Sequence, residues 1–489
     1  MQNRLLVCLI VLTLLANGCQ IPPQTPNARQ TGGIEPYQDV RQIDLQSAND
    51  QLNAELIKTL WFNETVTWPG QYKDVAHNIL EKGMNPGLGV RKLHTQGITG
   101  KGVNVAIIDQ NMCLDHPEYQ GKIVKYHDVG TNQPSNQGSM HGPAVTSLLV
   151  GEHIGTAPGA SVYYAAAPSW TADAQYQADA LDWIVDENEK LPENAKIRVV
   201  SVSAAPSGPG SPFTKNGAAW DAAYKRAMEA NILVLDCTTD HGITAPCYYD
   251  LDDPDNVTKC KPGWPGMRLQ TKTGHIYIPT SLRTQAEEYS QGVYGYQYTG
   301  RGGLSWSIPY LAGILALGWQ VRPELKSSQL LGILFETAYV GEGEAKIINP
   351  PAFIEAVKKA NSPHGPNPNR LCSGRLPLVS HPRLGVQYPT VARRSPPVTA
   401  HGALRFNPKR ATHLDRLGST RDNAAAFVRF VLAFISSCPR VNVLAFVFEH
   451  VIDNPRDFAS GSNNGFGYAM LGAHATIERA QGRVGAPTA

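Results

Sequence analysis

Residues 102–109, with the sequence GVNVAIID, decide the fold of this chain of 489 residues. The stretch is mainly apolar and ends in an acidic residue, Asp109. A short, nearly continuous apolar run is typical of a parallel strand that is buried on both faces of its sheet. Ligands of open α/β sheets bind beyond the carboxyl ends of such strands, so Asp109 is expected at a rigid position beside a site.

Around this strand, strand patterns and helix patterns alternate. Strands are predicted at residues 161–167, 197–202 and 232–235, and helices at residues 140–150, 172–189, 217–230 and 306–319. The last of these helices has Pro309 in its first turns, where a missing N–H costs little. The alternation predicts an α/β fold with a mainly parallel sheet.

Three polar residues stand at the ends of these elements. Asp109 ends a strand, His141 begins a helix, and Ser305 follows two glycines at a helix start, where the helix dipole is positive. Taken singly, each has a structural explanation, as a capping Asp, a hydrogen-bonded core His or an N-cap Ser. Together, their order and their separations of 32 and 164 residues match the Asp, His, Ser arrangement of subtilisin.

Residues 100–320 resemble the subtilase family of serine proteases. Four motifs carry the resemblance: residues 102–109 followed by His116-Pro117-Glu118, residues 140–147, residues 155–160 (GTAPGA), and residues 303–313 with Pro309 and Gly313. In the second motif, Gly142 would allow another segment of the backbone to approach closely. The resemblance implies a subtilisin-like α/β fold, with a mainly parallel sheet and helices on both faces. Enzymes with Gly-x-Ser-x-Gly and a final His, such as lipases, do not fit this motif order.

The resemblance also implies a mechanism and a substrate class. Ser305 would attack a peptide carbonyl, His141 would act as the base, and Asp109 would fix the imidazole tautomer. The partner is then a peptide or protein substrate, and no cofactor is implied. Residues 201–204 match the family's substrate-pairing segment. Substrate contacts are expected from Ser203, Ala204 and Ala205, and the methyl group of Ala205 would favour small or slender residues before the cut.

The expected oxyanion donor departs from the family pattern. The family usually has an Asn here, but in our alignment of residues 232–242 Asp240 takes its place. An ionised carboxylate only accepts hydrogen bonds, and loss of one oxyanion donor costs roughly 3–4 kcal/mol. Three interpretations stay open: a protonated Asp240 in an enzyme that prefers acid, substitution by Thr239 or another donor, or weak activity. The runner-up function is therefore a peptide-binding pseudoprotease.

The N-terminus predicts export. Arg4 precedes an apolar run at residues 5–15, which is too short to span a bilayer and ends in the lipobox-like LANGC at residues 15–19. The resemblance to bacterial lipoproteins implies a signal peptide over residues 1–18 and acylation of Cys19. We therefore expect an exported protein that is anchored by this lipid to a membrane of the cell envelope. The alternative is an ordinary signal peptide with a chance cysteine.

Composition suggests the remaining boundaries. Residues 1–360 hold 18 Lys and 10 Arg, whereas residues 361–489 hold 1 Lys and 14 Arg. We therefore predict a flexible tether at 19–50, an N-terminal extension or short pro-segment at 51–95, a peptidase domain at 96–360, and a C-terminal extension, accessory or foreign, at 361–489. The hydrophobic content of 42% excludes a wholly disordered chain, and the net charge of +2 argues against a nucleic-acid binder.

Cysteines and metals are constrained by spacing. Disulfides are permitted in an exported protein, and Cys247 and Cys260, which flank a polar loop, are the favoured pair. Free buried thiols are the alternative. No Cys-x-x-Cys or His-x-x-x-His spacing suggests zinc. The stretch between Ser147 and Gly155 lacks the insertion that carries calcium in many subtilases, so no metal is expected.

Overall fold

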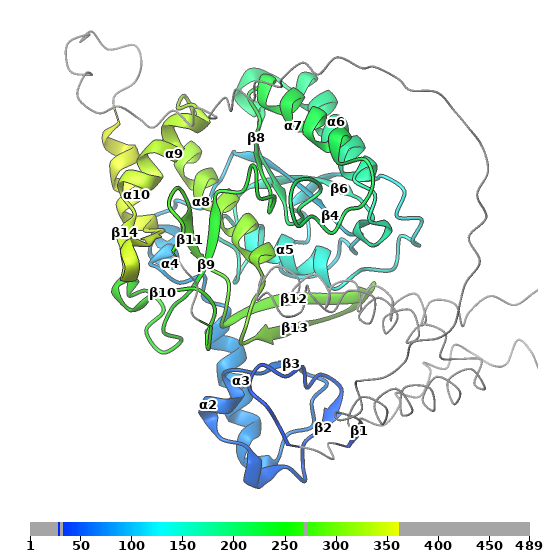
Figure 1. Cartoon of the computed structure of the whole chain (residues 1–489), viewed down its shortest axis with the longest axis vertical. Coiled ribbons are helices and arrows are strands. Elements are labelled where there is room, and N and C mark those ends of the chain that lie inside the picture. The colour runs from blue at the N-terminus through cyan, green and yellow to red at the C-terminus, as the bar shows by residue number, and fades with distance from the viewer. Residues whose placement is uncertain (1–27, 30–32, 268–270, 361–489) are drawn as a thin grey trace, which may run out of the picture. The chain divides into compact units, whose positions relative to one another are not determined.

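The computed structural model describes residues 28–29, 33–267 and 271–360 of the chain (Figure 1). The predicted signal peptide, Cys19 and the C-terminal extension at 361–489 lie outside the described residues, as does most of the predicted tether. Within the described ranges, no helix is both long enough and apolar enough to cross a bilayer.

The central sheet has five parallel strands in the order β5-β6-β4-β7-β8. Their bounds are β4 Asn104–Asp109, β5 Ile123–Asp128, β6 Ser161–Ala166, β7 Ile197–Val202 and β8 Leu233–Leu235. The predicted parallel sheet is therefore confirmed. Only β5 was missed, because this strand is largely polar and none of its residues is fully buried.

Helices cover both faces of this sheet, and the side chains of β4 show why. Val105 and Ile107 belong to one apolar core, whereas Ala106 and Ile108 belong to another. Successive side chains of a strand point to opposite faces, so β4 supplies both cores. The four helices that pack on the sheet are α5 His141–Val150, α6 Gln175–Glu189, α7 Gly217–Glu229 and α8 Ser307–Val321.

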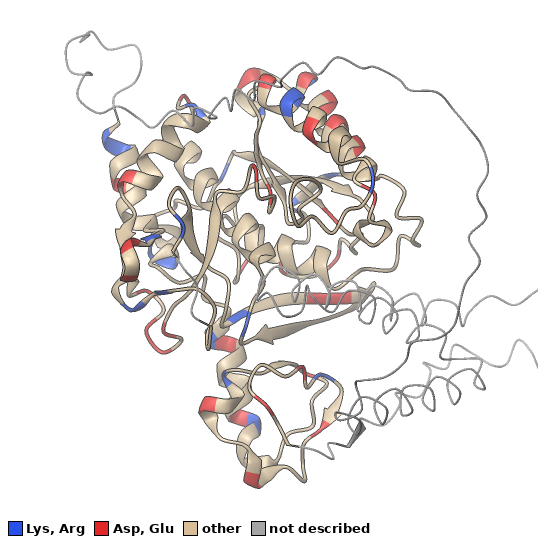
Figure 2. Ribbon diagram, viewed as in Figure 1, with Lys and Arg blue, Asp and Glu red and all other residues tan. Residues whose placement is uncertain are grey.

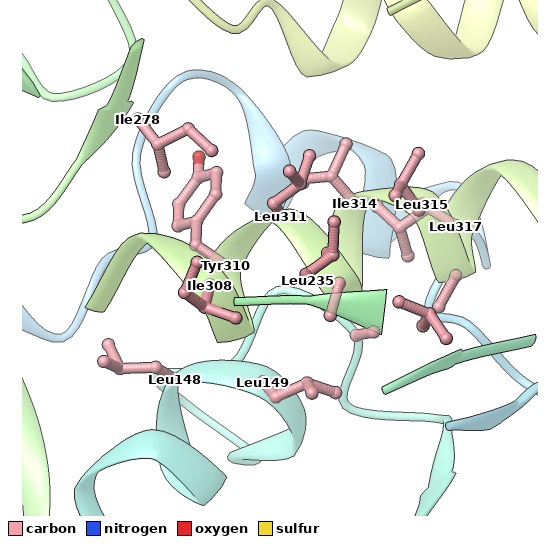
Figure 3. Packing of buried hydrophobic residues seen from close by; sticks show 14 of the residues in the cluster. Leu148, Leu149, Leu235, Ile278, Ile308, Tyr310, Leu311, Ile314, Leu315 and Leu317 are labelled. Carbon is pink, nitrogen blue, oxygen red and sulfur yellow. The ribbon is translucent and has the colours of Figure 1, made fainter. Parts of the chain in front are cut away.

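The first core lies around α8, as Figure 3 shows. Leu311 and Ile314 of α8 lie near Leu235 of β8, and α5 contributes Leu148 and Leu149. All residues of α5 are buried, and α8 is buried from Ser307 to Trp319. The second core joins the sheet to α6 and α7. The predicted helix at 172–189 begins later, at Gln175, because Ala172 has a left-handed backbone with φ of 52°.

Two further sheets of three or more strands were not predicted. A mixed sheet has the order β10-β9-β11-β15-β14, and an antiparallel sheet has the order β12-β13-β3. Their strands are β3 Trp61–Asn63, β9 Thr244–Tyr248, β10 Lys261–Pro262, β11 Ile276–Pro279, β12 Arg283–Ser290, β13 Val293–Thr299, β14 Tyr339–Val340 and β15 Lys346–Ile347. Figure 2 shows acidic residues along β12, although the first six residues of this strand are buried. Buried polar residues hide such a strand from any apolar pattern.

The N-terminal segment packs against the rest of the described chain. β3 pairs with β13, with Phe62 opposite Tyr298, and both side chains lie in a third apolar core. Arg41 forms an ion pair with Glu287 of β12 and stacks over the Trp61 ring. The other elements are β1 Ala28–Arg29, β2 Ile43–Asp44, α2 Ala54–Ile57, α3 Gly70–Gly83, α4 Val90–Thr95, α9 Ser327–Glu336 and α10 Pro350–Lys359.

The favoured cysteine pair is adjacent in space. The Sγ atoms of Cys247 and Cys260 lie 3.2 Å apart, and both residues are buried. β9 and β10 bring them together, since Cys247 pairs with Pro262 in the antiparallel register. The residues are free thiols in this structure, so the disulfide stays a prediction.

Replacement of Gly313 by Ala will destabilise the fold. A Cβ atom there would lie 1.9 Å from Oγ1 of Thr156, in the turn that α8 crosses. Because overpacking of a core typically costs about 1–3 kcal/mol, we expect that loss in the free energy of unfolding, measured by urea denaturation. Gly332→Ala in α9 is the matched control, since its Cβ meets nothing within 4 Å. Equal effects of the two substitutions would contradict the packing argument.

Candidate active site

Asp109 and His141 meet at the carboxyl end of the central sheet. Asp109 is the last residue of β4 and His141 the first of α5. Nδ1 of His141 lies 2.7 Å from Oδ1 of Asp109, and both side chains are buried. A carboxylate only accepts, so Nδ1 carries the proton and Nε2 is left as an acceptor. The backbone N–H of Gln110 also donates to Oδ1 of Asp109, at 2.8 Å, which fixes the carboxylate.

Gly142 makes this meeting possible. A Cβ atom at Gly142 would lie 2.7 Å from the carbonyl oxygen of Gln110 and 3.0 Å from that of Asn111. The predicted close approach of another backbone segment to Gly142 is therefore confirmed, and that segment is the loop after β4. Asn111, in the same loop, has a structural role, because its side chain donates to Gln137 O at 2.9 Å.

Ser305 is held by a reciprocal contact with Ser203. It lies in a short 3₁₀ turn, Leu304–Trp306, that leads into α8, and it is half-buried. Its Oγ donates to the carbonyl oxygen of Ser203 at 3.3 Å, and Oγ of Ser203 donates to the carbonyl oxygen of Ser305 at 2.8 Å. The end of β7 therefore positions the serine at the start of α8.

Trp306 brings this serine turn onto the histidine. Its ring stacks on the imidazole of His141, with centroids 5.2 Å apart and planes inclined by 28°. Within the described chain, the hydroxyl of Ser305 bonds to Ser203 and not to His141. Catalytic hydrogen bonds often tighten only when substrate is bound, so this geometry is compatible with a resting site. From the sequence, Trp306 was expected only as the first residue of the predicted helix at 306–319, and its stacking on His141 was not predicted.

The expected substrate segment lies partly inside the sheet. Ser201 pairs with Ile107 of β4 on one side and with Leu235 of β8 on the other, so this residue lies within the sheet. Substrate pairing by residues 201–204 stays a prediction. Only the chain from Ser203 onward extends past the sheet. The carbonyl oxygen of Ala204 accepts from Cys237 N at 2.9 Å.

Ala205 lies just beyond, in the same segment. It is buried, and its carbonyl oxygen accepts from the hydroxyl of Ser211 at 2.6 Å. The substrate roles of Ser203, Ala204 and Ala205 stay predictions. The carbonyl oxygens of Ala204 and Ala205 already accept hydrogen bonds. A substrate strand would therefore have to pair with other backbone groups or share these two oxygens.

Asp240 lies in an exposed turn after β8. A Cβ atom at Gly208 would lie 3.1 Å from its Oδ2, so the carboxylate faces the loop that follows Ala205. The hydroxyl of Thr239 donates to Pro209 O at 2.9 Å, so its proton is already engaged. Among the described residues, the Asp240 side chain is therefore exposed and the Thr239 hydroxyl is not free to donate. The oxyanion role of either residue stays a prediction.

A buried carboxylate, Asp236, organises this turn and was missed by the sequence analysis. It accepts from the indole N–H of Trp220 at 3.2 Å and from the N–H and hydroxyl of Thr238 at 3.0 and 2.7 Å. Nδ1 of His241 lies 3.3 Å from it, and the hydrogen bond to Asp236 raises the pKa of His241. The His241 ring stacks on Tyr224 at 3.9 Å. The residues on either side of Asp240 are thus rigidly held.

The acidic residue after the His-Pro pair, Glu118, has protein partners. Its buried carboxylate accepts from the N–H and Nδ1 of His153 and from the hydroxyl of Tyr296, each at 3.0 Å. A cavity of about 200 Å³ lies elsewhere, at the opposite end of β4 from Asp109, and so is no part of the candidate site. It is lined by Lys101, Gly102, Val103, Asn104, Asn194, Lys196, Arg198, Trp319, Gln320 and Pro323.

Comparison with known proteins points to the same region. Residues 100–265 match the model of the Subtilase family. The chain is 22% identical over 304 residues to Subtilisin-like protease PopC of Myxococcus xanthus, an alignment that covers 55% of this chain and 62% of PopC. It is also 22% identical over 311 residues to Subtilisin-like protease 2 of Trichophyton equinum, covering 59% and 70%. The chain thus spans less than two thirds of the length of PopC.

Solved structures give weaker likenesses. A chain from the structure titled "Structural basis of subtilase cytotoxin SubAB assembly" matches with a TM-score of 0.45 and 15% identity, covering 56% of this chain and 95% of that one. Fervidolysin from Fervidobacterium pennivorans matches with a TM-score of 0.42 and 16% identity, covering 59% and 46%.

Proposed function

From the subtilase-family match of residues 100–265, we propose that the protein is a serine endopeptidase that cuts peptide or protein substrates through Asp109, His141 and Ser305. The observation that carries the proposal is the 2.7 Å hydrogen bond from buried His141 to buried Asp109 at a strand end. The stacking of Trp306 on His141 supports it, because it brings the residue beside Ser305 onto the imidazole.

In the proposed reaction, Oγ of Ser305 attacks the scissile carbonyl while Nε2 of His141 takes the hydroxyl proton. The same proton then passes to the leaving amine, and water hydrolyses the acyl-enzyme with His141 again as base. Asp109 keeps the proton on Nδ1 and stabilises the imidazolium. The hydroxyl of Ser305 first has to leave the carbonyl oxygen of Ser203, which requires a rotation about its Cα–Cβ bond.

Reaction with a fluorophosphonate tests the nucleophile. These reagents phosphorylate an activated serine, so we expect the full chain to be labelled and Ser305→Ala to be unlabelled. Ser328→Ala is the matched control, since Ser328 is an exposed serine at the start of α9 and is not a member of the triad. Labelling is measured by intact mass and mapped by peptide mass spectrometry.

The alternative is a pseudoprotease that binds peptides without cutting them. Two observations favour it: Ser305 is bonded to Ser203, and the residue at the oxyanion position is an exposed carboxylate. If folded protein stays unlabelled at every pH from about 5 to 8, the endopeptidase is excluded and the binding function is favoured.

The second test concerns Asp240 as the expected oxyanion residue. A carboxylate only accepts hydrogen bonds, whereas the side-chain amide of Asn donates them. Asp240→Asn should therefore raise kcat on an unfolded protein at pH 8 by up to about 10²-fold. An unchanged or lower kcat in Asp240→Asn would refute the assignment of Asp240 to the oxyanion position.

We also propose that the protein is exported and anchored to a membrane of the cell envelope through lipid on Cys19. The support is the sequence pattern at residues 15–19. Wild-type protein should partition into detergent and carry acyl chains by mass spectrometry. Cys19→Ser should lose both properties, whereas Cys8→Ser, inside the predicted signal peptide, should keep them. Lipid-free protein with a processed N-terminus at another position would contradict the anchor.

A further inference from the structure

Three ligand-type side chains from two distant segments meet beside the candidate active site. Sγ of Cys113, one carboxylate oxygen of Asp115 and one of Glu288 all lie within 4.8 Å of one another. Cys113 and Asp115 belong to the loop after β4, whereas Glu288 belongs to β12. Cys113 and Glu288 are buried, at 2% and 0% exposure.

Two carboxylate oxygens in this cluster lack hydrogen-bond donors. Glu288 Oε1 and Asp115 Oδ1 are both buried, and neither has a hydrogen-bond partner within the described ranges. The Glu288 carboxylate is otherwise held by the hydroxyl of Tyr119, which donates to its second oxygen at 3.1 Å, and by the backbone N–H of Gly292.

No positive side chain compensates these groups. Among the described residues, no Lys, Arg or His lies within ion-pair distance of Asp115 or Glu288; the nearby Glu287 is the acid that pairs with Arg41. Burying a charge without a partner is costly, so such a cluster is stable either with protons or with a bound cation. A cation would satisfy both free oxygens at once.

We propose that Cys113, Asp115 and Glu288 form a binding site for a thiophilic divalent cation of the Zn²⁺ type. A thiolate disfavours Ca²⁺ and Mg²⁺, which take oxygen ligands, and favours zinc. Zn–S and Zn–O distances of about 2.3 and 2.0–2.2 Å place ligand atoms about 3–4 Å apart, which small side-chain adjustments reach from the observed cluster. Water completes four-coordination.

The position of the cluster gives the cation a structural consequence. Gly138 lies between the two segments: a Cβ atom there would be 2.2 Å from Glu288 O and 3.4 Å from Cys113 N. The N–H of Gly138 donates to Tyr289 O at 2.9 Å. Residues 136–139 lead directly into His141, and the loop of Cys113 follows Asp109. The bound cation therefore ties together the chain on both sides of the Asp109 and His141 pair.

No metal was predicted from the sequence because the three side chains are far apart in the chain. Glu288 is 173 residues from Asp115, and β12 itself was not predicted. The stretch between Ser147 and Gly155, where many subtilases carry a calcium-binding insertion, does not overlap this cluster.

Cadmium provides a direct probe, because a Cd²⁺–thiolate bond absorbs in the ultraviolet. We would titrate reduced full chain carrying Ser305→Ala, so that self-cleavage and the proposed function do not affect the result. This parent also carries Cys247→Ser and Cys260→Ser, because these two adjacent thiols would bind Cd²⁺ themselves. We expect one Cd²⁺ per chain with a charge-transfer band, displaced by Zn²⁺, and a Zn²⁺-dependent rise in Tm. Cys113→Ser should abolish the band and the rise in Tm. Glu288→Gln should weaken Zn²⁺ binding at least about tenfold, since even outer contacts of metal sites are worth that much.

Cys237→Ser is the matched control, because Cys237 is another free cysteine and lies outside the cluster. It should bind Cd²⁺ and Zn²⁺ like the parent. The proposal is overturned if the parent shows no band, or if the band and the Tm shift survive in Cys113→Ser. It is also overturned if Glu288→Gln binds Zn²⁺ as tightly as the parent, even when Cys113 is needed. Circular dichroism shows that each variant is folded.

Discussion

The burial of β4 on both faces is the constraint on which the rest of the structure depends. The strand pairs with β6 on one side and β7 on the other, and its side chains fill two separate cores. A one-residue slip would exchange the two faces and expel Asp109 from the strand end. The carboxylate therefore has one position, and every other part of the candidate site is arranged around it.

From that fixed carboxylate, the site is assembled by packing rather than by chain neighbours. Gly142 allows α5 to start against the loop after β4, which sets His141 on Asp109. Trp306 then packs on the imidazole, and it carries the start of α8 with it. Since α8 is buried over most of its length, the serine turn is held by the same core that holds the sheet.

The sequence predicted those elements that have a regular pattern of apolar residues. The apolar runs of β4, β6, β7 and β8 were found, and the strand end and helix start that hold Asp109 and His141 followed from them. β12 was missed because its buried residues are polar and charged and find partners far along the chain. The hydrogen bonds of Asp236 were missed for a different reason: its donors Thr238 and Trp220 lie nearby in the sequence, but a single acid after an apolar run does not indicate burial.

The loop after Asp109 is held by contacts with distant parts of the chain. Tyr164 donates to Gln110 O at 2.5 Å, and the side chain of Asn111 donates to Gln137 O at 2.9 Å. The same loop then carries Cys113 and Asp115 against β12. The short chain from Asp109 to Asp115 therefore joins the strand end that holds the candidate site to the buried acidic cluster at β12.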